Sequence, residues 1–152
     1  MIENDLETAC LNWLSELNYE CLTGDDVSSG GSHEGRQKYL EVVLKPRLHE
    51  AIDRLNPDLS TASIDEAVSK FSDYGSQSLI EGNREIYEWI RNGVPIEVEG
   101  ADGHKSIIKV QAFNFNDFDD NDFLAVQQFT VHGSKVRRPD VIIFVNGLPI
   151  VI

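Results

Sequence analysis

The last twelve residues constrain the fold more than any other part of the sequence. Every residue of Val141–Val145 is apolar, and Leu148–Ile152 carries no polar side chain either. Asn146-Gly147 stands between them and is the dipeptide most typical of a two-residue turn joining antiparallel strands. A strand without polar side chains suits a sheet that is covered on both faces. The sequence therefore predicts a buried hairpin at this end.

Apolar residues at helical spacing precede this hairpin. They predict helices over residues 3–17, 37–55, 63–71 and 79–91. We expect a break near Lys45, because Pro46 suits only the first turn of a helix. The pattern from Ser63 to Glu66 is that of a capping box, so the third helix is expected to begin there.

Alternating patterns predict strands over residues 19–22, 94–99, 106–113 and 123–131, with loops over 24–35 and 114–122. Helices dominate residues 1–93 and strands dominate 94–152. At 152 residues the chain has the length of one ordinary domain. We therefore predict a single α+β domain over residues 1–152, with a central mixed β-sheet flanked by helices.

The charge is strongly acidic but uneven. There are 26 Asp and Glu against 13 Lys and Arg, a net charge of −13, which excludes a generally basic nucleic-acid binder. From residue 123 to 152, however, the only acid is Asp140, against the bases Lys135, Arg137 and Arg138. That segment carries +2, and residues 1–122 therefore carry −15.

Nothing in the sequence indicates a membrane or secreted protein. No apolar run approaches 18 residues, and the N-terminus is acidic, unlike a signal peptide. Cys10 and Cys21 form no disulfide framework and have no zinc spacing. We expect a cytoplasmic protein with no membrane partner, in which Cys10 is a core thiol on the first helix.

Four acids crowd one predicted loop: Asp117, Asp119, Asp120 and Asp122. They lack the alternating ligands, central glycine and final glutamate of a calcium-binding EF-hand loop. We therefore expect a solvated loop.

Asp140 opens an otherwise apolar strand and follows Pro139, which itself suits a strand start. An ionised carboxylate at such a place is costly to bury unless it is paired or coordinates a metal. Arg137 and Arg138 allow two interpretations: a salt bridge to Asp140, or contacts to phosphates, which guanidinium groups bind bidentately.

At this point the sequence resembles a known family, the N-terminal nuclease region of the R (restriction and translocation) subunit of type I restriction enzymes. The resemblance is carried by Asn121-Asp122-Phe123, Gln128-Phe129-Thr130-Val131, Arg137-Arg138-Pro139-Asp140 and Phe144-Val145-Asn146-Gly147-Leu148-Pro149. Arg54-Leu55-Asn56-Pro57 and Asn92-Gly93-Val94 also fit it. It covers nearly the whole chain and is strongest from Asn121 onward.

The resemblance implies a restriction-endonuclease-like fold of the PD-(D/E)xK class, with Pro139-Asp140 supplying the first acid. Some members also use an acid on the first helix, for which Glu7 is our candidate and Glu3 the other possibility. The implied Glu-x-Lys would follow Leu148–Ile152, and these 152 residues do not contain it. We expect the sequence to be cut just before it, so the fold is incomplete at the C-terminus.

The implied activity is Mg²⁺-dependent hydrolysis of foreign double-stranded DNA, with Asp140 as a metal ligand and Lys135, Arg137 and Arg138 on the DNA backbone. The resemblance also implies ATP-driven translocation, with ATP bound outside this chain, and partners in the methylation and specificity subunits. The 152 residues alone are expected to be inactive.

Two alternatives remain open. One is a non-catalytic module of the same fold that docks DNA or other subunits. The other is a stand-alone acidic interaction domain, which a chain with no exposed sheet edge at Leu148–Ile152 would favour.

Overall fold

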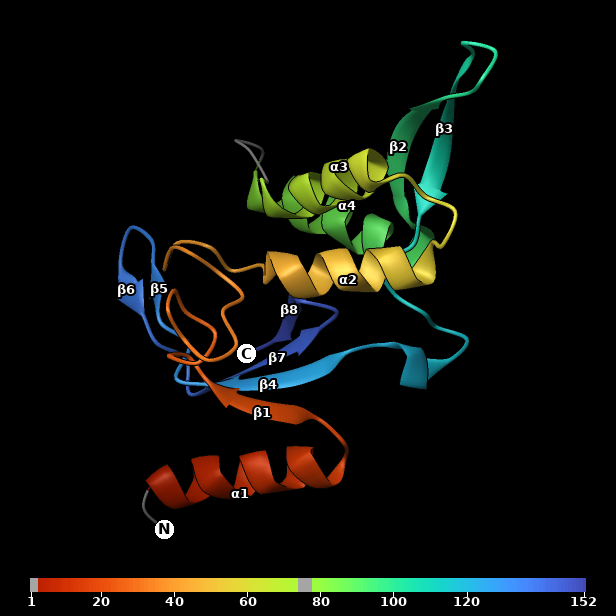
Figure 1. The fold of residues 1–152 in the computed structure, drawn as a ribbon. Coiled ribbons are helices and arrows are strands. Elements are labelled where there is room, and N and C mark those ends of the chain that lie inside the picture. Colours follow the sequence, from red (N-terminus) through yellow and green to blue (C-terminus); the bar gives the residue numbers. More distant parts are fainter. Residues whose placement is uncertain (1–2, 74–77) are drawn as a thin grey trace. The chain divides into compact units, whose positions relative to one another are not determined.

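The computed structural model describes residues 3–73 and 78–152 (Figure 1). The chain divides into two compact units, which we describe separately. One consists of Met1–Arg47 and Asp122–Ile152, and the other of Leu48–Asn121. These units cut across the helical and strand-rich halves of the sequence.

The first unit is built on a four-stranded sheet in the order β1 (Glu20–Thr23), β4 (Phe123–Gln127), β7 (Val141–Val145) and β8 (Leu148–Val151). β1 runs parallel to β4, whereas β4–β7 and β7–β8 are antiparallel, so the sheet is mixed. Asn146 and Gly147 adopt φ of 51° and 78°, which closes the β7–β8 hairpin predicted from the sequence.

One face of this sheet forms the core of the first unit. Phe144 and Phe129 lie edge to face with ring centroids 5.3 Å apart. The buried cluster consists of Val27, Leu44, Leu124, Val126, Phe129, Ile142 and Phe144. Helix α1 (Glu3–Glu16) packs against β1 and β4. Along β7 the residues alternate between buried and half-buried, because side chains of a strand point to opposite faces.

A small second hairpin, β5 (Val131–His132) and β6 (Val136–Arg137), also belongs to this unit. The predicted continuous strand over 123–131 is therefore wrong. Gln128 adopts φ of 58°, a left-handed conformation that a strand cannot contain, and it ends β4 at Gln127.

The second unit pairs helices with a two-stranded antiparallel sheet, β2 (Val94–Glu99) and β3 (Lys105–Val110). It contains most of α2 (Lys45–Leu55), together with α3 (Thr61–Ser72), α4 (Leu79–Asn92) and the short 3₁₀ helix η1 (Phe118–Asp120). Helices α3 and α4 pack against β2. The inner face of α3 carries Ile64, Ala67, Val68 and Phe71.

Besides the end of β4, three boundaries differ from the prediction by two or more residues. Residues 37–44 are not helical, because Glu41 accepts the backbone N–H groups of Gln37 (2.8 Å) and Lys38 (3.0 Å) and closes a turn. Helix α3 begins two residues earlier than the predicted residue 63, since Ser60, not Ser63, accepts the capping hydrogen bond. β3 ends at Val110 instead of Phe113.

The predicted α+β architecture with a mixed sheet is confirmed, and helices pack on the sheet of each unit. β8 lies at the edge of its sheet, and Ile150, Val151 and Ile152 are 45%, 52% and 87% exposed. A stand-alone interaction domain would have been favoured by the absence of an exposed sheet edge at Leu148–Ile152. The exposed β8 therefore does not support that alternative. Within residues 3–73 and 78–152, no helix has the length and apolar character needed to cross a membrane.

Candidate functional site

Asp140 lies immediately before β7 and is exposed. Its main-chain carbonyl accepts the N–H of Gln128 at 2.9 Å. Its carboxylate forms no hydrogen bond or ion pair with any described residue. The salt bridge to Arg137 or Arg138 that the sequence allowed is therefore not formed, and both oxygens of Asp140 are accessible to a ligand.

Glu7, the first-helix candidate, is half-buried on α1. Its Oε2 accepts hydrogen bonds from Nε2 of Gln127 at 2.7 Å and from Nε2 of Gln128 at 3.0 Å. These two bonds, with a smaller contribution from the charge of Arg138, lower the pKa of Glu7. The carboxylate is therefore ionised at neutral pH.

Glu7 on α1 and Asp140 before β7 both lie beside Gln128, at the end of β4. Gln127, the last residue of β4, pairs with Val141, the first residue of β7. Gln128 then contacts both acids, with its side chain on Glu7 and its backbone N–H on Asp140. Two of the residues singled out from the sequence thus both contact Gln128 at one end of the sheet. The side chain of Glu3 lies outside the described residues.

The three candidate bases lie close together in the sequence, shortly before Asp140. Lys135 lies in the turn of the β5–β6 hairpin, Arg137 ends β6, and Arg138 stands two residues before Asp140. All three side chains are exposed, and no acid of the described part of the chain forms an ion pair with them. The charge of Arg138 contributes to the lowered pKa of Glu7, so this base, just after the β5–β6 hairpin, acts electrostatically on that carboxylate.

Sequence reasoning missed Gln127, Gln128 and Gly24. Gly24 donates its N–H to the carbonyl of Gln127 at 2.7 Å, and a Cβ on Gly24 would lie 2.4 Å from the carbonyl oxygen of Gln128. A pair of amide side chains at the end of an apolar run was the available signal for the two glutamines. The left-handed turn at Gln128 has no such signal, because glutamine seldom adopts it.

The acids present fit Mg²⁺ in kind but are few. Glu7 and Asp140 offer carboxylate oxygens, which Mg²⁺ prefers, and Mg²⁺ often uses only one or two carboxylates with waters and phosphates. The Oε1 of Glu7 and both oxygens of Asp140 are unbonded among the described residues. No group of three or more His, Cys, Asp or Glu suited to a metal occurs in those residues.

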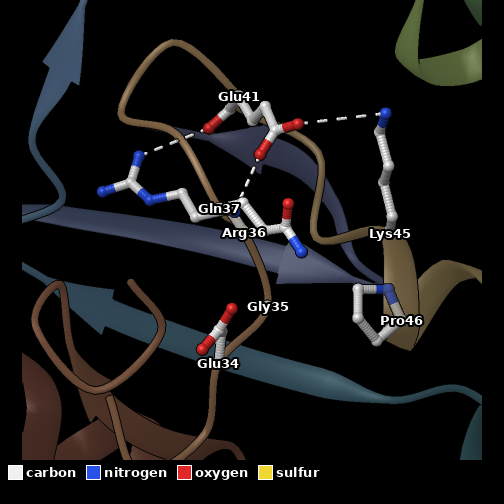
Figure 2. A pocket seen from close by; sticks show the side chains of 7 residues that line it. All are labelled: Glu34, Gly35, Arg36, Gln37, Glu41, Lys45 and Pro46. Atoms are coloured by element: carbon white, nitrogen blue, oxygen red, sulfur yellow. Dashed lines mark hydrogen bonds and ion pairs between the residues drawn. The ribbon is translucent and has the colours of Figure 1, made fainter. Parts of the chain in front are cut away.

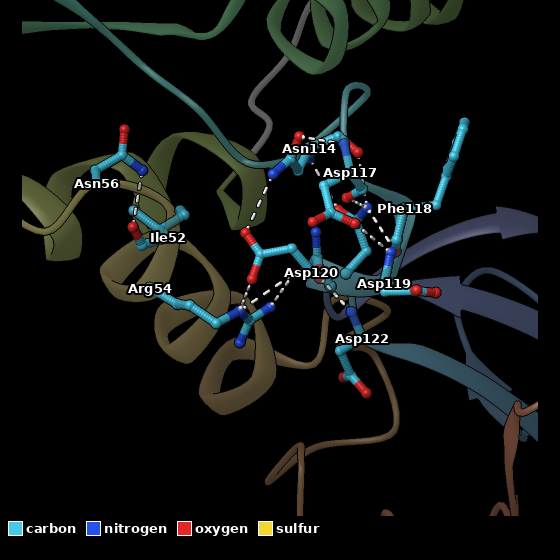
Figure 3. Close-up of polar contacts among 11 residues, drawn as sticks. Ile52, Arg54, Asn56, Asn114, Asp117, Phe118, Asp119, Asp120 and Asp122 are labelled. Carbon is cyan, nitrogen blue, oxygen red and sulfur yellow. Dashed lines mark hydrogen bonds and ion pairs between the residues drawn. The ribbon is translucent and has the colours of Figure 1, made fainter.

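The acidic loop serves the structure of the second unit (Figure 3). Asp120 contacts Arg54 at 3.4 Å and accepts from Nδ2 of Asn114 at 3.1 Å. Asp117 caps η1 by accepting the N–H of Asp119 at 3.2 Å. In the first unit, Asp122 is bound by Arg47 at 2.9 Å. The carboxylates of Asp117, Asp120 and Asp122 thus take part in local structure, whereas the Asp119 side chain is exposed, as expected for a solvated loop.

A separate pocket of about 310 Å³ lies in the loop before α2. Figure 2 shows that the Glu41 carboxylate accepts a hydrogen bond from the backbone N–H of Gln37 and forms an ion pair with Lys45. Arg36, only 4% exposed, donates to the carbonyl of Glu41 at 3.3 Å and lies 3.7 Å from the centre of the Phe129 ring. Glu41 pairs with Lys45 and Arg36 donates to backbone and hydroxyl oxygens of the same loop, so these side chains hold the loop in place.

Comparison with known proteins shows where such a chain occurs. The family model described as Type I restriction enzyme R protein N terminus matches residues 1–152. The chain is similar to the type I restriction enzyme HindI endonuclease subunit of Haemophilus influenzae, with 33% identity over 152 residues, 99% of this chain and 14% of that protein. It is 28% identical over 151 residues to the "Putative type I restriction enzyme MjaIXP endonuclease subunit" of Methanocaldococcus jannaschii. This match covers 97% of this chain and 14% of that protein. The chain thus spans about 14% of the length of these relatives.

Proposed function

The chain belongs to the family of type I restriction enzyme R protein N-terminal regions, and on this premise we propose that it supplies part of the DNA-cleaving site of an R subunit. The observation that carries the proposal is that Glu7 and Asp140 both contact Gln128 at the β4–β7 end of the sheet, beside an exposed basic hairpin. The PD-(D/E)xK fold remains part of this proposal, with Pro139-Asp140 as its first acidic position.

Asp140 and Glu7 would hold Mg²⁺. When bound, Mg²⁺ supplies charge stabilisation and a more acidic water for phosphodiester hydrolysis. Asp140 contributes oxygens that receive no hydrogen bond from the described residues, and Glu7 contributes Oε1 while its Oε2 is held by amides. Arg138 adds positive charge that acts on Glu7, where a DNA phosphate would otherwise be repelled.

Lys135, Arg137 and Arg138 would bind the phosphates of double-stranded DNA. Such contacts position the duplex and do not read its sequence. The −15 of residues 1–122 repels DNA, so approach would be confined to the +2 segment. Sequence recognition, methylation and ATP-driven translocation would then belong to other parts of the complex: the specificity and methylation subunits and the rest of the R subunit.

The decisive experiment is DNA cleavage by the assembled complex whose R subunit carries this region. Asp140→Asn should abolish cleavage in Mg²⁺ and leave DNA binding intact, because the exposed side chain supports no described contact. Asp25→Asn is the matched control, since Asp25 is also exposed and its carboxylate has no hydrogen bond in the described part of the chain. Cleavage by Asp140→Asn at the wild-type rate would disprove the proposal.

The basic hairpin gives a second test. Arg137→Ala with Arg138→Ala should weaken DNA binding equally across sequences and reduce the slope of log affinity against log salt by about 2. Arg84→Ala with Arg91→Ala, two exposed arginines of α4, is the control. A loss confined to particular DNA sequences would contradict backbone contact.

The 152 residues alone should not cut DNA, because no Glu-x-Lys follows Asp140 within them. Incubation of the purified chain with supercoiled plasmid and Mg²⁺ checks this. Nicking that disappears in Asp140→Ala would show that the site is already complete.

One observation favours the docking module as a second candidate. Leu6, Trp13 and Leu17, on and just after α1, are 57%, 62% and 67% exposed. Scattered single apolar residues on a surface need no partner, but three around one helix suit a protein contact. Under that function, Asp140→Asn would leave cleavage unchanged, and Leu6→Ser with Trp13→Ser would prevent subunit assembly.

A further inference from the structure

Two amide groups converge on a single oxygen of Glu7. Nε2 of Gln127 and Nε2 of Gln128 both donate to Oε2, at 2.7 and 3.0 Å. The other oxygen, Oε1, receives no hydrogen bond from the described residues. A carboxylate held in this way on one oxygen has a fixed orientation and one oxygen left for a ligand.

The backbone of Gln128 also takes part in this site. Its N–H donates to the carbonyl of Asp140 at 2.9 Å, and its φ of 58° is a conformation that residues with a Cβ adopt reluctantly. Strained backbone of this kind persists where the surroundings determine it, and it concentrates at functional sites. Gly24 helps to determine it, since its missing side chain lets the Gln128 carbonyl approach.

We infer that Gln127 and Gln128 are positioning residues that hold Glu7 through Oε2 and so present Oε1 to a divalent cation shared with Asp140. This inference rests on the proposed function. Hydrogen-bonding partners of metal ligands fix ligand orientation, and their loss commonly lowers metal affinity about 10- to 100-fold. Because both donors bind the same oxygen, either one alone would retain part of the effect.

The test measures Mn²⁺ binding to the R subunit in the absence of DNA, by electron paramagnetic resonance of free Mn²⁺, together with the Mg²⁺ concentration that gives half-maximal cleavage. Gln127→Ala combined with Gln128→Gly should raise both values about tenfold or more. Gln128→Gly alone should raise them less. Gln37→Ala, a change at an exposed glutamine of the loop before α2, should leave both unchanged.

Gln128→Gly separates positioning from a merely structural role. Glycine adopts positive φ readily, so this variant should unfold at the wild-type temperature or above while it binds Mn²⁺ more weakly. A lower unfolding temperature with unchanged Mn²⁺ affinity would overturn the inference and show that the amides only support the fold.

Glu7→Gln and Asp140→Asn distinguish failure of the inference from failure of the proposed function. If these two variants lose Mn²⁺ binding and cleavage while the glutamine variants keep both, the inference is wrong and the function stands. If Asp140→Asn also keeps both, the proposed function itself is wrong. Loss in the acid variants together with weakened binding in Gln128→Gly supports both.

Discussion

Gly24 is the position where a single methyl group should disturb both the sheet and the candidate site. In Gly24→Ala the new Cβ would lie 2.4 Å from the Gln128 carbonyl oxygen, 3.0 Å from its carbonyl carbon and 3.1 Å from Cα of Phe129. All three atoms are backbone, so no side-chain rotation can relieve the contact. The chain must move by about 0.6 Å before the shortest contact reaches even 3.0 Å.

Overpacking of this kind costs about 1–3 kcal/mol. Alanine also restricts the unfolded chain, which returns about 0.4–1 kcal/mol. We therefore expect Gly24→Ala to lower the free energy of unfolding by about 1–2 kcal/mol, equivalent to a fall of roughly 0.5–1 M in the urea midpoint. Urea titration followed by circular dichroism measures this shift.

Gly133→Ala is the matched control. Its nearest neighbour would be the Lys135 carbonyl oxygen at 3.8 Å, an ordinary contact. The control should stay within about 0.5 kcal/mol of wild type. If Gly24→Ala unfolds at the same urea concentration as Gly133→Ala, the close approach of Gly24 to Gln128 is not a constraint, and its part in fixing the site is refuted.

Two further predictions concern the first unit. Hydrogen bonds from the Thr23 hydroxyl and N–H, and from Ser32, lower the pKa of Asp26 to about 2; this stabilisation is present above the unfolded value of 3.8 and is lost as pH falls towards 2. Unfolding free energy should therefore fall between pH 5 and 2 more steeply in wild type than in Asp26→Asn; equal slopes in the pH-dependent urea titrations would contradict this. Phe144→Ala should cost about 3–5 kcal/mol, since Phe144 is fully buried against Phe129. Phe118→Ala, at a 65% exposed side chain, should cost less than about 0.5 kcal/mol by the same titration, and similar losses for both would argue against the described core.

The sequence predicted those parts of the fold in which local chemistry and tertiary packing agree. The β7–β8 hairpin was predictable because Asn146-Gly147 both ends one apolar run and adopts the positive φ that the turn requires. Residues 37–44 were not, since their helical spacing is overridden when the Glu41 carboxylate takes the N–H groups of Gln37 and Lys38. A capping carboxylate three or four residues ahead in sequence leaves no periodic signal.

The candidate site was predictable in its charged members and not in its amides. Asp140 stood out because a carboxylate before an apolar strand needs an explanation. Glu7 was a candidate only because of its place on the first helix. The hydrogen bond that links it to the site comes from Gln127, which is 120 positions away in the sequence. Gln127 and Gln128 carry no charge, so no argument from burial cost or pairing pointed to them before the register of β4 with β7 was known.

The interruption of β4 explains how one small region can hold both signs of charge. A regular strand from Phe123 to Val131 would carry the chain straight past the end of β7. The left-handed Gln128 instead turns the chain out of the sheet into the β5–β6 hairpin, and the chain returns through Arg137 and Arg138 to Asp140. The three bases therefore lie between Gln128, whose side chain holds Glu7, and Asp140. The irregularity at Gln128 thus places exposed bases directly before Asp140 and near Glu7, and among the described residues no ion pair joins them to Asp140.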